Sequence, residues 1–525
     1  MSESVLPNSS VTRSGAIGAG FIAGLVAAVV MTTVMLLLMS LLEIAAPLTL
    51  FGDRLSVFFT ADKFLALMGQ LGGYNHMKQL GVGSVIGGQL LLGTLGGVLY
   101  GWIMARDAQR RRPMFSLGVS VFLPLFATTA FLWPVLGTHY GGLPVRNAAV
   151  VTIIGLLLSF LAYERTLVLG FGGLVGRSRS IPADAEFSPP IARRTLILGG
   201  VGLLVAGGGY ALLRKLWASA TFSYDGLQYK GADVQPITPN DKFYTVTKNV
   251  VDPEVRDSFW RLEVTGLVKT RQRYKLDRFK NLASVTQETT LMCISNGLDA
   301  GLMSNAVWKG VALRTILETA APLPTATKVR LHGVDNYTDT ITLAKALEPT
   351  TIVAYEMNGE RLPDRHGYPA RLIVPGYFGE KSVKWLTRIE LTDDSAVGFY
   401  EKQGWGPNFV IPTRSRIDAP DNGASFAMTA GVPIRGVAFG GDRGISRVEV
   451  STDDGKTWNE ARVDYPGTKL TWVLWSYRWQ PEGAADYTLT VRATDGDGNL
   501  QALDESRPFK SGTTGFHRIT VHVTA

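Results

Sequence analysis

Long apolar segments dominate the first 215 residues of this 525-residue chain, and they constrain its fold more than any other feature. Five can be drawn, over residues 16–42, 82–104, 115–136, 148–169 and 195–213. Each has about the 20 residues that a helix needs to cross a bilayer core, and their interiors are almost free of charge. A soluble helical bundle would show polar faces at helical spacing. The pattern predicts an all-α membrane region of about five transmembrane helices over residues 1–215, in contact with membrane lipid.

Basic residues in the loops around these segments predict an orientation. On one side of the membrane lie Arg13, Arg106, Arg110, Arg111, Arg112, Arg165, Arg177, Arg179, Arg193 and Arg194. The other side has Arg54, Lys63, Lys78 and Arg146. The richer side is expected to be cytoplasmic. A cytoplasmic N-terminus and five crossings place everything after residue 213 on the extracytoplasmic, periplasmic side, although Arg214 and Lys215 oppose this scheme.

Paired arginines, Arg193 and Arg194, stand directly before the fifth apolar segment. They are typical of a twin-arginine export signal retained as an anchor, a route that carries already folded proteins. They are equally consistent with two ordinary arginines on the cytoplasmic side. Both interpretations stay open.

Charge and histidine content exclude two kinds of ligand. The net charge of +8 and pI near 9.3 reflect the loop arginines, and no nucleic-acid motif is present, so no nucleic acid partner is expected. Before residue 216 only His76 and His139 occur, both outside the apolar cores, and no Cys-x-x-Cys-His is found. We therefore expect no haem in this chain.

Short strands and turns replace the apolar segments after a polar linker over residues 216–242. Alternating segments at 243–249, 260–264 and 328–334 predict half-buried strands, and Asn358-Gly359 predicts a hairpin. Residues 311–318 have helical spacing and end before Pro322. Residues 243–415 are therefore predicted to form an α+β domain.

The last part of the chain, residues 416–525, has a purely β pattern. Segments 444–451 and 487–493 alternate cleanly and are followed by the turns Asp454-Gly455 and Asp495-Gly496. Four tryptophans, Trp458, Trp472, Trp475 and Trp479, are available for a core. This pattern predicts an all-β sandwich of immunoglobulin type.

Cys293 is the only cysteine of the chain. It follows a strand-like run and precedes Asn296-Gly297, which places its thiol near a strand end, where a reactive group can meet solvent. A lone cysteine is also often a small buried hydrophobe. The residue type and position leave both interpretations open.

A second group of polar residues flanks the apolar run at 372–374. His366 and Arg371 precede this run, and Ser382 and Lys384 follow it. These donors could converge on an anion, with Arg371 as a bidentate fork and Lys384 as a point charge. The alternative is a solvated loop.

Three stretches together resemble the sulfite oxidase family of molybdenum enzymes. They are TLMCISN (290–296) with AVWKGV (306–311); HGYPAR (366–371) with VPG and KSVKW; and ISRVEVSTDDGKTW (445–458) with YTLTVRATDGDGN (487–499). The resemblance runs from about Phe243 to the C-terminus. It implies a molybdopterin-binding catalytic domain at 243–415 and an immunoglobulin-like domain at 416–525 that often dimerises, so a homodimer is possible.

The resemblance also implies roles for individual residues. Cys293 would ligate molybdenum, since soft thiolates suit this metal, and the metal would be carried by a pyranopterin cofactor. Cofactor contacts would come from Asn249, Asn296, His366, Arg371, Ser382 and Lys384. Tyr337 would hydrogen-bond a substrate oxygen, and Lys248 would attract a small polar or anionic substrate. The implied chemistry is two-electron oxygen-atom transfer.

Two departures from the family pattern bear on the substrate. Gly297-Leu298 stand where sulfite oxidases have a pair of arginines, and Lys248 replaces an arginine, so a sulfoxide becomes comparable to sulfite as the expected substrate. Electrons must pass to or from a separate electron-transfer protein or membrane redox partner. A reductase of S-oxides or N-oxides fed from the membrane, and a non-catalytic membrane scaffold that keeps the fold, remain alternatives.

Overall fold

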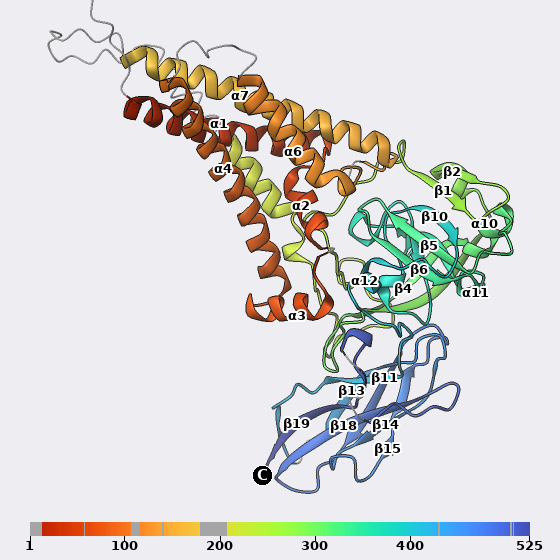
Figure 1. The fold of residues 1–525 in the computed structure, drawn as a ribbon. Coiled ribbons are helices and arrows are strands. Elements are labelled where there is room, and N and C mark those ends of the chain that lie inside the picture. Colours follow the sequence, from red (N-terminus) through yellow and green to blue (C-terminus); the bar gives the residue numbers. More distant parts are fainter. Residues whose placement is uncertain are drawn as a thin grey trace, which may run out of the picture. The chain divides into compact units, whose positions relative to one another are not determined.

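The computed structural model describes residues 13–56, 58–106, 116–138, 141–178, 207–428, 431–503, 507 and 509–525. The chain divides into two compact units, one helical and one rich in strands (Figure 1). The first unit comprises Met1–Ser56, Leu67–Ser223 and Asn249–Val251. The second comprises Val57–Ala66, Tyr224–Lys248 and Asp252–Ala525.

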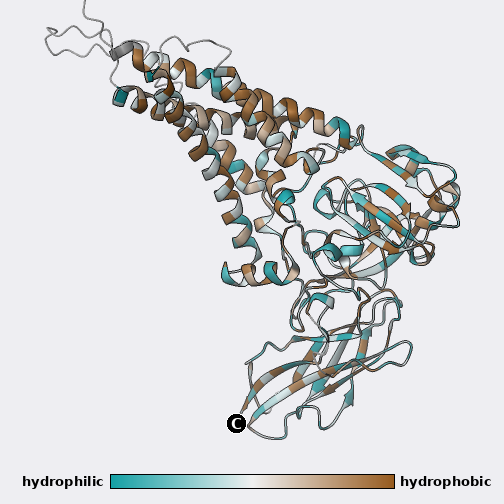
Figure 2. Ribbon diagram, viewed as in Figure 1, coloured by the Kyte–Doolittle hydropathy of each residue, from teal (hydrophilic) through white to brown (hydrophobic). Residues whose placement is uncertain are grey.

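Among the described residues, four helices of the first unit are long and apolar enough to cross a membrane. They are α1 (Arg13–Leu42), α4 (Tyr74–Arg106), the continuous run of η2 (Gly118–Phe122), α6 (Leu123–Leu132) and η3 (Trp133–Val135), and α7 (Val145–Ser178). At 1.5 Å per residue, the 30 residues of α1 extend for about 45 Å, more than the hydrocarbon thickness of a bilayer. Hydrophobic residues are concentrated on these helices (Figure 2).

Four of the five predicted segments coincide with these helices. The fifth, 195–213, falls largely on residues 179–206, which lie outside the described part of the chain; residues 207–219 are helical. The prediction of five spans is therefore corrected to four for the described residues. Residues 216–219 continue that helix, so the predicted linker begins later than residue 216.

Helices α1 and α4 pack closely against each other at glycine residues. A Cβ atom at Gly24 would lie 2.7 Å from the Cα of Gly97, and one at Gly20 would overlap the Gly97 carbonyl. On α7, the Tyr163 hydroxyl donates to the carbonyl of Gly93 at 2.6 Å. Small residues let helix backbones approach closely, which is a usual way to associate helices in lipid.

The α+β part of the second unit is built on two sheets. The first has the strand order β2-β1-β10-β5-β6, and the second has the order β3-β4-β7-β8, with β9 also pairing with β7. The strands of the first are β1 (Arg261–Gly266), β2 (Gln272–Lys275), β5 (Lys328–Gly333), β6 (Thr338–Thr342) and β10 (Leu386–Thr392). Those of the second are β3 (Ser284–Met292), β4 (Met303–Ala312), β7 (Ile352–Met357), β8 (Glu360–Arg361) and β9 (Arg371–Ile373).

Short helices complete this part, and Trp260, Trp308 and Trp385 are buried in its core. They are α9 (Leu276–Lys280), α10 (Leu313–Ala320), α11 (Leu343–Ala346) and α12 (Phe399–Lys402). The predicted strands at 260–264 and 328–334 correspond to β1 and β5, and the predicted helix at 311–318 corresponds to α10. Asn358 and Gly359 have positive φ values of 54° and 78°, as the hairpin turn between β7 and β8 requires.

The predicted strand at 243–249 is wrong. This segment has no strand assignment, and side-chain oxygens accept two of its backbone N–H groups. Tyr244 N donates to Ser304 Oγ at 3.1 Å, and Thr247 N donates to Asp225 Oδ1 at 3.0 Å. Its apolar alternation reflects burial beside these acceptors, since a buried backbone donor needs any partner and not necessarily a strand.

Two further sheets form a β-sandwich at the end of the chain, with the orders β11-β13-β17-β16 and β12-β19-β18-β14-β15. The first contains β11 (Arg414–Ala419), β13 (Val432–Phe439), β16 (Arg462–Tyr465) and β17 (Val473–Trp479). The second contains β12 (Ser425–Ala427), β14 (Ile445–Ser451), β15 (Asn459–Glu460), β18 (Asp486–Asp495) and β19 (His517–Thr524). The sandwich agrees with the sequence, and its immunoglobulin type stays a prediction.

The four tryptophans expected in the sandwich core have different positions. Trp475 and Trp479 are buried in it. Trp472 is fully buried but belongs to another cluster, with Tyr229 and Met292. Trp458 is only partly buried, and the Arg492 guanidinium lies 4.0 Å from its ring centroid.

Residues between α2 (Pro47–Ser56) and α4 contribute to the second unit. Ala61, the first residue of α3 (Ala61–Gln70), is 1% exposed and packs in a cluster with Trp405 and Phe409. Its N–H donates to the carbonyl of Gln403 at 2.7 Å. A segment that belongs to the membrane region by sequence therefore forms part of the core of the second unit.

Candidate active site

Cys293 stands directly after β3, at the start of a loop that returns to β4. Its N–H donates to the Leu302 carbonyl at 3.0 Å, and its own carbonyl accepts from Asn296 N at 3.1 Å. The Asn296 Oδ1 atom accepts from Leu302 N at 2.9 Å, so this side chain holds the loop closed. The thiol lies 3.1 Å from the Ser295 hydroxyl, and burial raises the pKa of the thiol to about 11.

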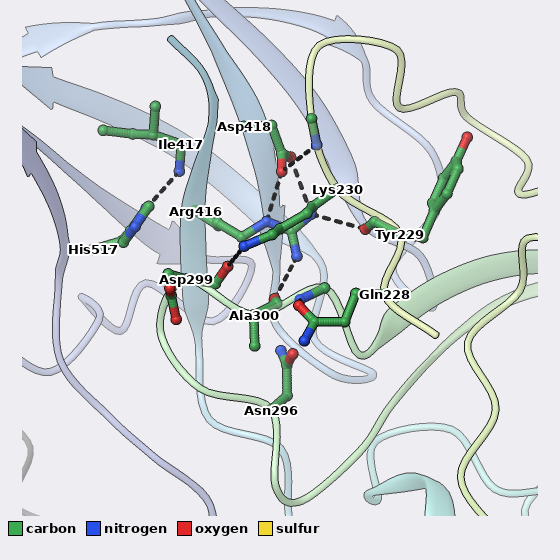
Figure 3. A network of polar contacts seen from close by, with 12 residues as sticks. Gln228, Tyr229, Lys230, Asn296, Asp299, Ala300, Arg416, Ile417, Asp418 and His517 are labelled. Carbon is green, nitrogen blue, oxygen red and sulfur yellow. Dashed lines mark hydrogen bonds and ion pairs between the residues drawn. The ribbon is translucent and has the colours of Figure 1, made fainter. Parts of the chain in front are cut away.

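Two arginines of β11 hold the same loop by its carbonyl groups. Arg414 donates to the carbonyls of Asn296 and Gly297 at 2.6 and 2.7 Å. Arg416 donates to the Ala300 carbonyl at 2.7 Å and pairs with Asp418 at 2.8 Å, as Figure 3 shows. Alternate residues of a strand share a face, so the spacing of the two arginines aims both at the loop. The sequence analysis did not identify them.

The segment from Gly379 to Trp385 runs beside the residue that precedes Cys293. A Cβ atom at Gly379 would lie 3.4 Å from the Met292 carbonyl and would overlap the Tyr244 hydroxyl, so no side chain fits there. In the same segment, Ser382 Oγ accepts from Val374 N at 3.1 Å. The predicted Ser382 thus joins this segment to the residue that follows β9.

His366 and Arg371 are joined to this segment by hydrogen bonds. Arg371 donates to the carbonyls of His366 and Ser382, both at 3.1 Å. His366 Nε2 lies 2.9 Å from the Asn240 carbonyl, which requires a proton on that nitrogen. Burial lowers the pKa of His366 to about 3 and that of Arg371 to about 10. At neutral pH the site therefore holds a neutral imidazole and a charged guanidinium.

Tyr337 lies against the same segment. Its hydroxyl lies 2.9 Å from Asp339 Oδ2 and 3.2 Å from the Glu380 carbonyl. Burial, followed by the nearby charge of Asp339, raises the pKa of Tyr337 well above its usual value. The phenol therefore stays protonated and can act as a donor.

The two predicted lysines are largely engaged. Lys248 Nζ donates to the Asp335 carbonyl at 2.7 Å and lies 3.9 Å from its carboxylate. Lys384 Nζ donates to the Arg365 carbonyl at 3.1 Å, and burial lowers its pKa. Asn249 belongs to the first unit, where its carbonyl accepts from Lys78 Nζ at 2.7 Å.

Sequence reasoning missed three residues near the thiol. Both carboxylate oxygens of Glu380 are buried and have no hydrogen-bond partner among the described residues, and burial raises the pKa of this group to about 8. After burial itself, the charge of a Cys293 thiolate is the next cause that raises the pKa values of Tyr244 and Tyr400. Glu380 directly precedes the KSVKW motif, but a glutamate before a lysine is typical of a solvated turn.

Unpaired buried atoms test whether the site fits a molybdenum cofactor. Arg371 Nε and Trp405 Nε1, like the Glu380 oxygens, are buried without a hydrogen-bond partner among the described residues. Such groups cost free energy unless a ligand or water satisfies them. A thiol able to ligate metal, a buried guanidinium and a neutral imidazole are suitable partners for a metal, anionic oxygens and a heterocycle. The residues fit a pyranopterin cofactor with Cys293 as the protein ligand.

Comparisons with known protein families agree with this fit. Residues 249–400 match the oxidoreductase molybdopterin binding domain, and residues 408–524 match the Mo-co oxidoreductase dimerisation domain. A crystal structure of the sulfane dehydrogenase SoxCD from Paracoccus pantotrophus shares the fold, with a TM-score of 0.50 and 23% identity, over 56% of this chain and 85% of that one.

Curated relatives include several sulfite oxidases. The mitochondrial enzyme of Drosophila melanogaster is 32% identical over 50% of this chain and 55% of its own length. The human mitochondrial enzyme is 29% identical over 55% of this chain and 62% of its length. The chain thus spans little more than half the length of these two relatives. The Gallus gallus sulfite oxidase is 30% identical over 50% of this chain and 68% of its length. The chain belongs to the sulfite oxidase family of molybdopterin-dependent oxidoreductases.

Proposed function

We propose that this chain is a membrane-anchored molybdopterin oxidoreductase that transfers an oxygen atom to or from a small substrate in a two-electron reaction. The observation that carries the proposal is the position of Cys293 at the end of β3, beside the segment that joins His366, Arg371 and Tyr337. The cofactor, when bound, would supply the oxygen-atom transfer, and the protein would supply orientation and charge. The electrons would come from or go to a separate carrier protein or membrane redox partner.

The residues have distinct parts in this proposal. Cys293 ligates molybdenum through its thiolate. Asn249, Asn296, His366, Arg371, Ser382 and Lys384 hold the pterin. Tyr337 donates a hydrogen bond to the substrate oxygen, and Lys248 helps to position the substrate. Asn296 acts through the loop that it closes, because Leu302 already occupies its side-chain oxygen.

A neutral S-oxide or N-oxide is favoured over an oxyanion as the substrate. Three cations around the site have other partners: Lys248 lies against Asp335, Lys381 pairs with Asp339 at 2.7 Å, and Arg414 binds loop carbonyls. Gly297 and Leu298 add no charge. A doubly charged oxyanion would lose hydration here with little compensation, whereas a neutral substrate loses less.

Metal analysis and substrate comparison test the proposal. Protein purified from a host that makes the cofactor is expected to contain stoichiometric molybdenum. Its kcat/KM for reducing a small sulfoxide with an artificial reductant is expected to exceed that for oxidising sulfite. Protein that lacks stoichiometric molybdenum would refute both enzyme functions and support the scaffold alternative. Faster sulfite oxidation would refute the S-oxide preference alone.

Cys293→Ser tests the metal ligand. We expect loss of molybdenum and of turnover, with far-ultraviolet circular dichroism and the unfolding midpoint close to the parent values, because the thiol fills little of the core. A matched substitution at an exposed serine of strand β3, Ser284→Ala, should change none of these. Unchanged turnover in Cys293→Ser would disprove the assignment.

A further inference from the structure

A continuous chain of hydrogen bonds leads from Tyr337 to the surface of the second unit. The Tyr337 hydroxyl lies 2.9 Å from one carboxylate oxygen of Asp339. The other oxygen of Asp339 accepts from Lys381 Nζ at 2.7 Å, and Lys381 Nζ lies 2.5 Å from Glu401 Oε1. Each link is short enough for a hydrogen bond between charged or polar groups.

The two middle members of this chain are the most deeply buried. The side chains of Asp339 and Lys381 are 1% and 3% exposed, whereas that of Glu401, on α12, is 21% exposed, and Tyr337 is partly buried. The chain therefore runs from the partly buried phenol through two buried charges to a carboxylate that meets solvent. Thr340 holds the two carboxylates of the chain, because its N–H donates to Asp339 at 2.8 Å and its Oγ1 donates to Glu401 at 3.1 Å.

Buried ion pairs of this kind add little to the free energy of unfolding. Taking three charges out of water costs free energy that their mutual attraction repays only in part, and apolar packing is often as stable. Close packing also fixes the geometry, since a Cβ atom at Gly398 would overlap the Asp339 carboxylate. These residues are costly to bury, held rigidly and connected to the proposed site. A role in function, besides any role in stability, would account for this arrangement.

We propose that Asp339, Lys381 and Glu401 form a proton path between Tyr337 and solvent. This inference rests on the proposed function. Reduction of a sulfoxide breaks the S–O bond and needs two electrons, which a separate reduced carrier protein supplies, and two protons, which leave with the oxygen as water. For each proton, Tyr337 protonates the departing oxygen and becomes a tyrosinate. Lys381 then transfers a proton to the Asp339 carboxylate, which passes a proton to the tyrosinate and returns to its charged form. Lys381 is reprotonated through Glu401 from solvent.

The protonation states of these groups suit such a path. Burial raises the pKa of Asp339, which makes a transient proton on this carboxylate less costly. Burial lowers the pKa of Lys381, but the charges of Asp339 and Glu401 outweigh burial and the pKa is raised, so the ammonium is present at neutral pH. The other titratable groups whose charges act on the path are Tyr400 and Glu380, both of which raise the pKa of Tyr337.

Kinetics of substituted enzyme test the path. In molybdenum-loaded protein, Asp339→Asn and Lys381→Met should lower kcat for the preferred substrate by about 100-fold or more, the usual size of a lost proton-transfer step, with KM little changed. Glu401→Gln should lower kcat less, shift its pH profile and increase the solvent isotope effect. Lys381→Arg should retain more activity than Lys381→Met. The matched control is the Lys309–Glu356 ion pair of the same domain, 3.2 Å apart and partly exposed, substituted as Lys309→Met and Glu356→Gln.

A second readout does not require turnover. In apo protein, near-ultraviolet titration of Asp339→Asn, compared with the Tyr337→Phe/Asp339→Asn double variant, should show a phenol that titrates at lower pH than in the parent protein. An unchanged phenol titration, or path variants with the kcat, pH profile and isotope effect of the controls, would overturn the path. If the parent protein carried no molybdenum or turned over no substrate, the proposed function would fail, while the phenol titration would still decide whether Asp339 controls Tyr337.

Discussion

Two buried ionisable side chains define the electrostatics of the site at the scale of single residues. Arg371 keeps its charge, and its Nε atom has no hydrogen-bond partner among the described residues. Glu380 keeps its proton, and neither of its carboxyl oxygens has a hydrogen-bond partner among the described residues. A charged donor beside a neutral acid suits a ligand that carries anionic oxygens, because a second negative charge would repel it. Because Glu380 is uncharged at neutral pH, it does not repel an anionic ligand that binds Arg371.

Glu380→Gln should change how stability depends on pH. A glutamate in the unfolded chain has a pKa of about 4.3, whereas burial raises the folded value for Glu380 to about 8. Between these pH values the folded protein holds a proton that the unfolded chain has lost, so stability falls as pH rises. The unfolding midpoint of the parent protein should therefore fall more from about pH 5 to about pH 8 than that of Glu380→Gln.

Thermal unfolding of both proteins across this pH range measures the difference. Glu254→Gln, at an exposed glutamate, is the control and should follow the parent curve. Parallel curves for the parent and Glu380→Gln would contradict a protonated Glu380.

Motifs in the sequence identified the residues that stand next to recognisable turns. Cys293, His366 and Arg371 could be found in this way, because a single cysteine and a Gly-Pro-bracketed strand are visible without a fold. Glu380 and Lys381 could not be assigned, because their roles depend on burial created by α12 and β6, which are distant in sequence. Local patterns do not report such long-range packing.

At the scale of elements, β11 stabilises the cysteine loop although the two belong to different layers of the second unit. Arg416 lies on β11, is buried, and bridges Asp418 to the loop carbonyl of Ala300. Lys230, from the segment before the α+β region, donates to the Asp299 carbonyl at 2.9 Å on the same loop (Figure 3). The loop that presents Cys293 is thus fixed from outside its own sheets.

Arg416→Ala should destabilise the protein by about 3 kcal/mol, because removal of one partner leaves the buried Asp418 charge uncompensated. Arg462→Ala is the matched control, since Arg462 also pairs with an aspartate two residues later, but its side chain is 79% exposed. The control should lose less than about 1 kcal/mol. Denaturant unfolding measures both values, and hydrogen exchange should increase at residues 293–302 in Arg416→Ala alone. Equal losses would contradict the role of β11.

Gly97→Leu should disrupt the contact of α4 with α1. A side chain at this position would overlap the backbone of Gly20 and Gly24, at a cost on the order of 3 kcal/mol. Gly87→Leu, on the same helix, gains similar helix propensity and meets nothing within 4 Å. Thermal unfolding in detergent should separate the two variants, and equal midpoints would contradict close glycine packing.

Elements with a strong period could be predicted from the sequence, and elements defined by their partners could not. The four candidate membrane spans and strands β1, β5 and β14 follow apolar runs or alternation. The 243–249 segment alternates as well, yet its donors go to Ser304 and Asp225. Alternation of apolar and polar residues predicts which side chains are buried. It does not predict which group accepts each backbone N–H.

At the scale of the whole molecule, the chain's own contacts bear on its membrane topology. Residues 57–66 belong to the second unit, and Asp62 lies 3.7 Å from Lys510 within it. If the candidate spans cross a membrane, these residues lie on one side of it, and an even number of crossings separates residue 66 from residue 224. Three described spans lie in that interval. The sequence-predicted crossing at 195–213, largely outside the described residues, would supply the fourth.

We therefore expect position 63 and the C-terminus to face the same, extracytoplasmic side. Lys63→Cys, at an exposed position and in a Cys293→Ser background, should react with a membrane-impermeant thiol reagent in cells with an opened outer envelope. A phosphatase fused after Ala525, active only when exported, should be active, and a fluorescent reporter that folds only in the cytoplasm should be dark. Labelling at position 63 with an inactive C-terminal phosphatase would contradict the shared side.

The contribution of Ala61 to the second unit also has a consequence for biogenesis. Ala61 is synthesised long before its partners Gln403, Trp405 and Phe409, because it precedes them by more than 300 residues in the chain. If Arg193 and Arg194 act as an export signal for a folded second unit, the apolar site that Ala61 occupies is empty on export, and the segment around Ala61 fills it afterwards. Binding of the Ala61 segment would then be the last step of assembly. A truncated protein without its N-terminal helices would expose this apolar site and would aggregate through it.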